Sequence, residues 1–315
     1  MAVRRTWIWL AVALVIGVAA VSMIGDVRHV GDRLAGFGWW AFAAALGLAL
    51  ANYAIRWLRW QLYLAREGVR VPAASSAIVF GAGLSLSVTP AKLGELLKCY
   101  LLRELHDVPV PLTAPIVVAE RVTDLIALTA LALIGVAAYG VAGGLVIVAA
   151  ALVVLGLALL AWPRPAHALI DVATRPARLR RLREPLHATL ANLATLCRPA
   201  PLAAATAIAI PAWLCECAGF ALVCNAFPGA HIGLGLATVI YAGTTIAGAL
   251  SFLPGGLGVT EGAMTLALVG GAAHLDNATA LAATLLTRLA TLWFAVLLGV
   301  LFLGLARARI ARRAL

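Results

Sequence analysis

Apolar segments long enough to cross a membrane recur along this chain and constrain its fold more than any other feature. Residues 7–25 and residues 144–163 are two examples. A membrane-spanning helix needs about 20 mostly apolar residues. Only 12% of the 315 residues are charged, whereas a soluble domain carries about 25% charged residues. The sequence therefore predicts an all-α polytopic membrane protein.

Six full spans are predicted from the positions of the apolar segments. Proline interrupts two further apolar stretches, residues 74–105 and residues 234–272, because it lacks an amide donor and clashes with the preceding helical turn. We expect each stretch to form two short helices joined at the break, as a re-entrant hairpin or as two short spans. The predicted spans are residues 7–25, 38–57, 112–140, 144–163, 201–224 and 278–303.

The arginine distribution predicts the orientation, since cytoplasmic loops are enriched in Lys and Arg. Arg4 and Arg5 precede the first span, whose length exceeds the roughly 7–15 apolar residues of a signal peptide, so we expect a retained helix. Residues 164–200 and the C-terminal tail are rich in arginine, whereas loop 26–38 is balanced. We expect a multi-pass protein of the bacterial cytoplasmic membrane, with the N-terminus, the C-terminus and the connector 164–200 in the cytoplasm.

Several other classes of protein are disfavoured by the sequence. The net charge of +11 comes from arginines placed between apolar runs, so we expect no nucleic-acid partner. The cysteines form no C-x-x-C pair, and we expect buried thiols rather than metal ligands. No P-loop, H-E-x-x-H or G-x-S-x-G motif occurs, so we expect neither an enzyme nor a cofactor. The cysteines are Cys99, Cys197, Cys215, Cys217 and Cys224.

The two proline-broken stretches resemble each other. Residues 87–94 and residues 251–258 both read S-x-x-P-x-x-L-G, and Arg121 and Arg288 follow them at similar spacings. Chance similarity between two Pro/Gly breaks is the alternative explanation. If the predicted orientation holds, the first stretch enters from the cytoplasm and the second from outside, which makes the repeat inverted. Inverted repeats are typical of secondary transporters, whose sites form at discontinuous helices.

The repeat predicts how the chain is organised. We expect a single membrane domain over residues 1–315, in which repeat one covers about residues 38–140 and repeat two about residues 201–303. The basic connector 164–200 lies between the repeats, and part of it is expected on the anionic inner leaflet.

Charged residues recur every three positions after Pro90. Lys92, Glu95 and Lys98 would share one face of a helix that starts at this proline. A helix start offers free amide groups and the positive end of the helix dipole, which together form an anion site. The alternative is an amphipathic helix at the membrane interface with its charges in water. The two interpretations are compatible.

Three charges fall deep within predicted span 112–140. Glu120, Arg121 and Asp124 lie there, and Arg288 lies near the middle of span 278–303. Each such charge costs roughly 2.5–3.5 kcal/mol at the centre of a membrane helix, so it must face protein or a wet cavity. We expect Glu120 and Asp124 to reach Arg288 across the repeat interface. The alternative is a purely structural ion-pair network.

The second break is rich in glycine. Pro254, Gly255, Gly256 and Gly258 precede Glu261. Because glycine has no Cβ and permits positive φ, this backbone can approach a ligand or another helix closely. The alternative is a tight turn packed within the protein.

Two arginines end the second predicted span. Arg56 and Arg59 alternate with Trp57 and Trp60. Tryptophan and arginine at the end of a span are typical of anchoring at the membrane–water interface. We therefore interpret these residues as interfacial anchors.

Taken in order, these motifs resemble the membrane region of lysylphosphatidylglycerol synthases and of their free-standing, flippase-like relatives. The motifs are R-W-L-R at 56–59, P-x-K-x-G-E at 90–95, E-R-x-x-D at 120–124 and L-P-G-G-L-G at 253–258. The resemblance covers almost the whole chain. It implies a membrane region that moves lipid between leaflets, whereas a soluble C-terminal domain of the full synthases performs aminoacyl transfer. We see no such domain in this sequence and expect a free-standing relative without synthetic activity.

The main hypothesis is a flippase-like transporter that moves an anionic, phosphate-bearing lipid between leaflets. The expected cargo is an anionic phospholipid, a polyprenyl-phosphate-linked lipid or a hopanoid-type lipid. A homo-oligomer or a lipid-synthesis enzyme is the expected protein partner. The alternative function is a non-transporting accessory subunit of a lipid- or glycan-modifying enzyme. The expected substrate-binding residues are Pro90, Lys92, Gly94, Glu95, Lys98, Glu120, Arg121, Asp124, Pro254, Gly255, Gly256, Gly258, Glu261 and Arg288.

Overall fold

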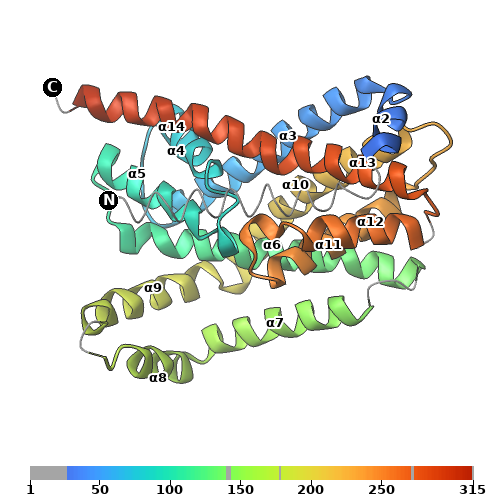
Figure 1. Cartoon of the computed structure of the whole chain (residues 1–315). Helices are drawn as coiled ribbons and strands as arrows, with labels where there is room; N and C mark the ends of the chain where they lie inside the picture. The colour runs from blue at the N-terminus through green and yellow to red at the C-terminus, as the bar shows by residue number, and fades with distance from the viewer. Residues whose placement is uncertain (1–26, 140–142, 177–178, 271–272, 314–315) are drawn as a thin grey trace.

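The computed structural model describes residues 27–139, 143–176, 179–270 and 273–313. Within these ranges the chain forms helices and turns and no strand (Figure 1). The predicted all-helical class is therefore confirmed for the described residues.

The helices before the connector include the first proline break. Pro90 starts the 3₁₀ segment η1, as expected for a residue that tolerates the first turn of a helix. The elements are α2 (Val27–Ala35), α3 (Trp39–Arg66), α4 (Ala73–Leu84), η1 (Pro90–Leu96), α5 (Leu97–His106) and α6 (Val110–Tyr139).

The connector and the second half follow. Helix α7 (Gly143–Ala161) corresponds to predicted span 144–163. The connector that follows it contains α8 (Pro163–Ala173), η2 (Arg180–Leu182) and α9 (Arg183–Leu196). The second half contains α10 (Pro199–Asn225), α11 (Leu234–Leu250), η3 (Pro254–Gly256), α12 (Val259–Gly270), α13 (Asn277–Arg288), the π-helical turn η4 (Leu289–Trp293) and α14 (Phe294–Arg313). Both broken stretches thus form two short helices on either side of a proline, as predicted.

Among the described residues, three helices are long and apolar enough to cross a membrane: α3, α10 and the continuous α13–α14 helix. They correspond to predicted spans 38–57, 201–224 and 278–303. The number of candidate spans rises to four if α7 and α8, which meet at a 93° bend, are counted as one span. Predicted span 112–140 forms α6, which lies outside this set. Predicted span 7–25 lies outside the described residues, so the count of six remains a prediction.

The two halves of the chain interleave. α3 packs along α10, α4 along α14, and α6 along α11, so each of these pairs joins the first half to the second. The breaks η1 and η3 also contact each other. This packing brings the two proline-broken segments, 164 residues apart in the sequence, to one place.

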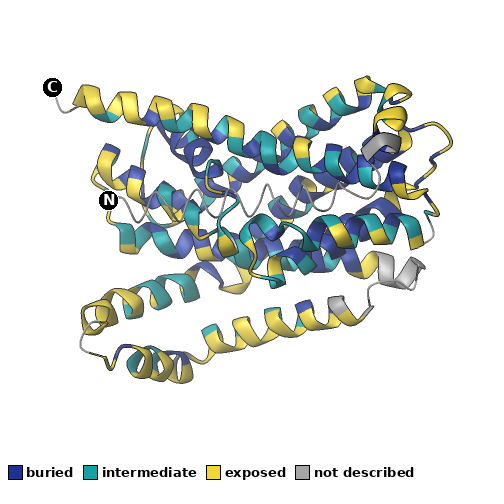
Figure 2. Ribbon diagram, in the orientation of Figure 1, coloured by how far each residue is buried: buried dark blue, intermediate teal, exposed yellow. Residues whose placement is uncertain are grey.

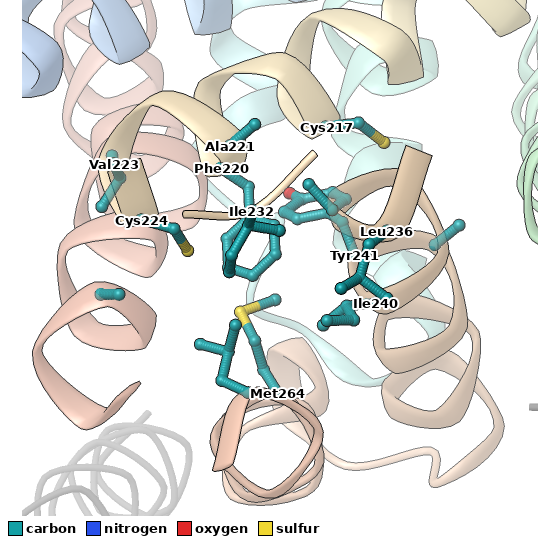
Figure 3. Packing of buried hydrophobic residues seen from close by; sticks show 14 of the residues in the cluster. Cys217, Phe220, Ala221, Val223, Cys224, Ile232, Leu236, Ile240, Tyr241 and Met264 are labelled. Atoms are coloured by element: carbon teal, nitrogen blue, oxygen red, sulfur yellow. The ribbon is translucent and has the colours of Figure 1, made fainter. Parts of the chain in front are cut away.

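Two hydrophobic clusters hold the bundle together. One includes residues of α3, α6, α10, α11, α12 and α13, and within it Phe220 and Met264 are fully buried and point toward each other (Figure 3). Cys217 and Cys224 pack in the same cluster, and all five cysteines of the chain are free thiols. The other cluster surrounds Trp60 and lies among α3, α4, α5, α6 and α14. The prediction of buried thiols is confirmed for every cysteine except Cys215, which is partly exposed.

The outer faces of α7 and α8 are exposed along most of their length (Figure 2). Ile147 and Val154 on α7 are 70% and 66% exposed. Contiguous apolar surface of this kind marks contact with a partner or a membrane. The exposed faces are therefore suited to lipid contact.

Candidate functional site

The first break is a compact turn. Lys92 lies within η1 with a left-handed backbone, φ 55°. The Gly94 amide donates to Thr89 Oγ1 over 2.7 Å, and a Cβ at Gly94 would collide with Leu86 and Thr89. The α-helix begins only at Leu97. Glu95 and Lys98 share a face as predicted, since they pair over 3.2 Å. The left-handed backbone at Lys92 takes that residue off this face, so the prediction is wrong for Lys92.

The second break depends on its glycines. Gly255, Gly256 and Gly258 have φ values of 61°, 66° and 83°, which side chains with a Cβ rarely adopt. A Cβ at Gly256 would also lie 2.9 Å from the Cα of Gly248 on α11. Glu261 accepts a 2.7 Å hydrogen bond from the Gly258 amide at the start of α12. The tight-turn interpretation therefore holds for Gly256 and Gly258.

Glu95 is the centre of a buried ion cluster. It lies 3.5 Å from Arg56, 3.2 Å from Lys98 and 3.2 Å from Arg121. Lys98 also pairs with Glu120, and its ammonium group lies 4.6 Å from the Trp60 ring centroid. Lys98 is 1% exposed. Its charge is thus satisfied inside the protein rather than offered to a ligand.

Asp124 is the centre of a neighbouring cluster. Its carboxylate lies 2.8 Å from Arg59 and 3.1 Å from Arg121, and Trp213 Nε1 donates to it over 3.2 Å. Arg59 is fully buried and Arg56 nearly so. The interpretation of these two arginines as interfacial anchors is wrong, because α3 continues to Arg66 and carries both into the bundle.

Arg288 pairs within its own half of the chain. Its Nε donates to Glu261 Oε1 over 2.6 Å, and its Nη2 donates to the Gly255 carbonyl over 2.7 Å. The predicted pairing of Arg288 with Glu120 and Asp124 is wrong, because those carboxylates are held by Lys98, Arg59 and Arg121. In each half, a glutamate at or just after the break pairs with an arginine of the next long helix. These pairs are Glu95–Arg121 in the first half and Glu261–Arg288 in the second.

A cavity of about 380 Å³ lies where the two breaks meet. Lys92 reaches it from η1, and its ammonium lies 5.7 Å from the centroid of the Trp213 ring. No carboxylate of the described residues lies within ion-pair distance of Lys92. The polar residues of the lining are Tyr53, Arg56, Ser87, Thr89, Lys92, Arg121, Asp124, Glu216, Tyr241, Thr245, Thr260, Arg288 and Thr291.

The predicted binding residues divide into two groups. Six line the cavity: Lys92, Arg121, Asp124, Gly255, Gly256 and Arg288. Eight do not line it: Pro90, Gly94, Glu95, Lys98, Glu120, Pro254, Gly258 and Glu261. Of the latter, the prolines and glycines shape the breaks, and Glu95 and Glu261 pair with Arg121 and Arg288. Lys98 and Glu120 pair with each other away from the lining.

Sequence reasoning missed part of the lining. Tyr53, Arg56, Trp213, Glu216 and Tyr241 face the cavity. Glu216 is the only charged residue of α10, so the cost of inserting a charge would have singled it out. The aromatic residues gave no such signal, because they are also common on lipid-facing surfaces.

The chemistry available at this site is charge and hydrogen bonding. In the described part of the chain, no group of three or more His, Cys, Asp or Glu residues could hold a metal ion. The cavity lining combines cationic, hydroxyl and apolar groups. Such a lining is suited to the polar head of an anionic molecule.

The fold and the site define a helical membrane protein with a charged cavity between two broken helices. The family described as the lysylphosphatidylglycerol synthase TM region matches residues 8–299. The chain belongs to this family, and it is thereby related to proteins of lipid modification or translocation. No match was found among curated proteins.

Proposed function

We propose that the protein is a flippase-like transporter that moves an anionic, phosphate-bearing lipid between the leaflets of a bacterial cytoplasmic membrane. The observation that carries this proposal is the cavity at the meeting point of the two breaks. Lys92 comes from the first break, and Arg288 is bonded to the second. One ligand can therefore contact both halves of the protein.

The cavity has the size of a head-group site. Ligand pockets commonly enclose about 300–1,000 Å³, and this one holds about 380 Å³. A whole lipid does not fit, so its acyl chains would remain outside. Phe252 and Leu253, which also line the cavity, are 69% and 45% exposed. They provide an apolar rim along which the chains can lie.

The order of elements supports an inverted repeat. Each half has a long helix, a shorter helix, a proline break, a second short helix and a long helix. The pairs Glu95–Arg121 and Glu261–Arg288 occupy equivalent places in this order. Opposed repeats around a midplane site are the arrangement that allows alternating access.

The arrangement of the loops supports the proposed orientation. Helix α8 of the basic connector and the C-terminus lie at one end of the bundle, whereas α2 lies at the other (Figure 1). The connector and the end of α14, two segments that the arginine distribution assigns to the cytoplasm, thus share one end. The whole chain, including the connector, would form a single membrane domain with cytoplasmic termini.

A non-transporting accessory subunit is the second candidate function. It is favoured by the exposed apolar face of α7, to which Ile147 and Val154 belong. A lipid-synthesis enzyme or a second copy of the chain could cover this face. In that case the cavity would be a structural feature, and its charged residues would not affect lipid movement.

Lipid movement in proteoliposomes tests the proposal. Vesicles would contain fluorescent phosphatidylglycerol in both leaflets. A reductant added outside bleaches the fluorophore of every lipid molecule that reaches the outer leaflet. Wild type should expose the inner-leaflet lipid. Lys92→Ala should slow this exposure about tenfold or more, since a charge-assisted contact contributes about 1.5–3 kcal/mol. Arg183→Gln, on the exposed part of α9, is the matched control.

The proposal fails if wild-type vesicles bleach no further than protein-free vesicles. Equal rates for Lys92→Ala and Arg183→Gln would remove the cavity from the transport path. Stable capture of a lipid-synthesis enzyme without lipid movement would favour the accessory subunit.

A further inference from the structure

Glu216 differs from the other buried carboxylates near the cavity. Its side chain accepts a hydrogen bond from the Tyr241 hydroxyl over 2.6 Å, and no cation of the described residues lies within ion-pair distance of it. Glu216 is 7% exposed and lines the cavity. The carboxylates that do have a cationic partner are Glu95, Glu120, Asp124 and Glu261.

The charged groups that face Glu216 from other elements are mostly already paired. Arg56 is held by Glu95, Arg288 by Glu261, and Asp124 by Arg59 and Arg121. Lys92 remains available. The titratable and charged groups around Glu216 are Tyr53 and Arg56 of α3, Lys92 of η1, Asp124 of α6, Tyr241 of α11 and Arg288 of α13.

An anion that binds beside Lys92 shares the cavity with Glu216, because both residues line it. Two arginines lie within ion-pair distance of Asp124, whereas no cation of the described residues lies that close to Glu216. Repulsion between like charges is stronger in a buried site than in water. Protonation of Glu216 removes this repulsion, and the neutral carboxyl group keeps Tyr241 as a hydrogen-bond partner.

We propose that Glu216 takes up a proton when the anionic head group enters the cavity, an inference that rests on the proposed function. The proton moves from water onto a carboxylate oxygen as one phosphate monoanion binds, so the charge of the cavity is unchanged. Because coupling between two ligands is reciprocal, the anion favours protonated Glu216 as much as the proton favours the anion. Lipid and proton would then cross together without net charge.

Calorimetry in buffers of different ionisation enthalpy tests this inference. Dihexanoyl phosphatidylglycerol would be titrated into detergent-solubilised protein between pH 5 and pH 7, a range in which Lys92 keeps its proton. At pH values where Glu216 of the free protein is ionised, wild type should take up close to one proton per bound lipid. In that range its affinity for the lipid should fall by up to tenfold for each unit by which the pH rises. Glu216→Gln should take up no proton, and its affinity should not vary with pH.

Glu104→Gln provides the matched control, because it removes an exposed carboxylate on α5 and should behave as wild type does. Lipid binding by wild type without proton uptake at every pH would overturn the inference and leave the proposed function standing. Uptake by Glu216→Gln equal to that of wild type would also overturn it. Absence of lipid binding by wild type would instead remove the proposed function, and this inference with it.

Discussion

Arg288 of α13 links the second break to α12, because it donates hydrogen bonds to Glu261 on α12 and to the Gly255 carbonyl in the break. One guanidinium group thus fixes the break and also lines the cavity. Glu95 and Arg121 make the corresponding connection in the first half, over 3.2 Å. The breaks are therefore held by charges, and the same charges bring the cationic surface to the cavity.

Arg288→Ala should destabilise the protein. Removal of one partner of a buried ion pair costs about 3–5 kcal/mol, because the other charge is left without compensation. The side chains of Arg288 and Glu261 are 12% and 14% exposed, so the loss should lie at or below this range. Thermal unfolding in detergent would measure the loss. Arg313→Ala is the control, since its pair with Asp107 is exposed and such pairs contribute only about 0–1 kcal/mol. Equal melting temperatures for the two variants would show that the Arg288 pair does not stabilise the break.

The two lysines of the chain should behave differently. Lys98→Ala leaves Glu95 and Glu120 with one cation fewer inside the bundle, so a loss of about 3–5 kcal/mol in stability is expected. Lys92→Ala removes no ion pair among the described residues and should leave the melting temperature close to that of wild type. Its effect should appear in lipid binding. The reverse pattern would place the ligand at Lys98.

The sequence was sufficient to locate the breaks and the buried charges. Proline in an apolar stretch predicted the breaks at Pro90 and Pro254, although Pro115 and Pro211 lie inside the continuous helices α6 and α10. A charge inside a span must be buried in protein whatever its partner. Both arguments are local, which is why Pro90, Pro254 and Asp124 could be recognised without the fold.

The partners of these charges could not be predicted, because they depend on how distant helices pack. Arg56 and Arg59 look like the end of a span until η1 and α6 bring Glu95 and Asp124 beside them. Helical periodicity placed Lys92 with Lys98, but the left-handed backbone at Lys92 is set by the tertiary packing of the break.

Two glycines of α14 should respond differently to substitution by alanine. A Cβ at Gly299 would collide with the backbone of Ser85, where α14 crosses the end of α4, whereas nothing lies within 4 Å of one at Gly304. Gly299→Ala should cost about 1–3 kcal/mol through overpacking. Gly304→Ala should be neutral or should stabilise by up to about 1 kcal/mol, because alanine favours helix. Equal unfolding behaviour of the two variants would contradict the close packing of α14 on α4.

Cysteine labelling tests the orientation. Arg181→Cys lies in the exposed connector and Asp32→Cys in exposed α2, and Cys215→Ala would remove the one native thiol that is not buried. A membrane-impermeant maleimide should label Arg181→Cys only from the cytoplasmic side and Asp32→Cys only from outside. Labelling of both positions from the same side would refute the predicted topology and the inverted repeat.

The last prediction concerns cooperation between the two breaks at one ligand. Lys92→Ala removes a charge from the first break. Arg288→Gln removes one beside the second and keeps an amide that can bond Glu261. If both cations hold the same phosphate, each single variant should weaken binding of phosphatidylglycerol in nanodiscs about tenfold or more. The double variant should lose less than the sum of the two free-energy changes, because the residues share a partner.

The alternative outcome has a distinct signature. If Lys92 merely sits at a water-exposed surface, its removal should have a small effect that salt screens, and this effect should add to that of Arg288→Gln. Binding isotherms for wild type, the two singles and the double, at low and high ionic strength, separate the two cases. Small additive effects would show that the two broken helices do not form one anion site.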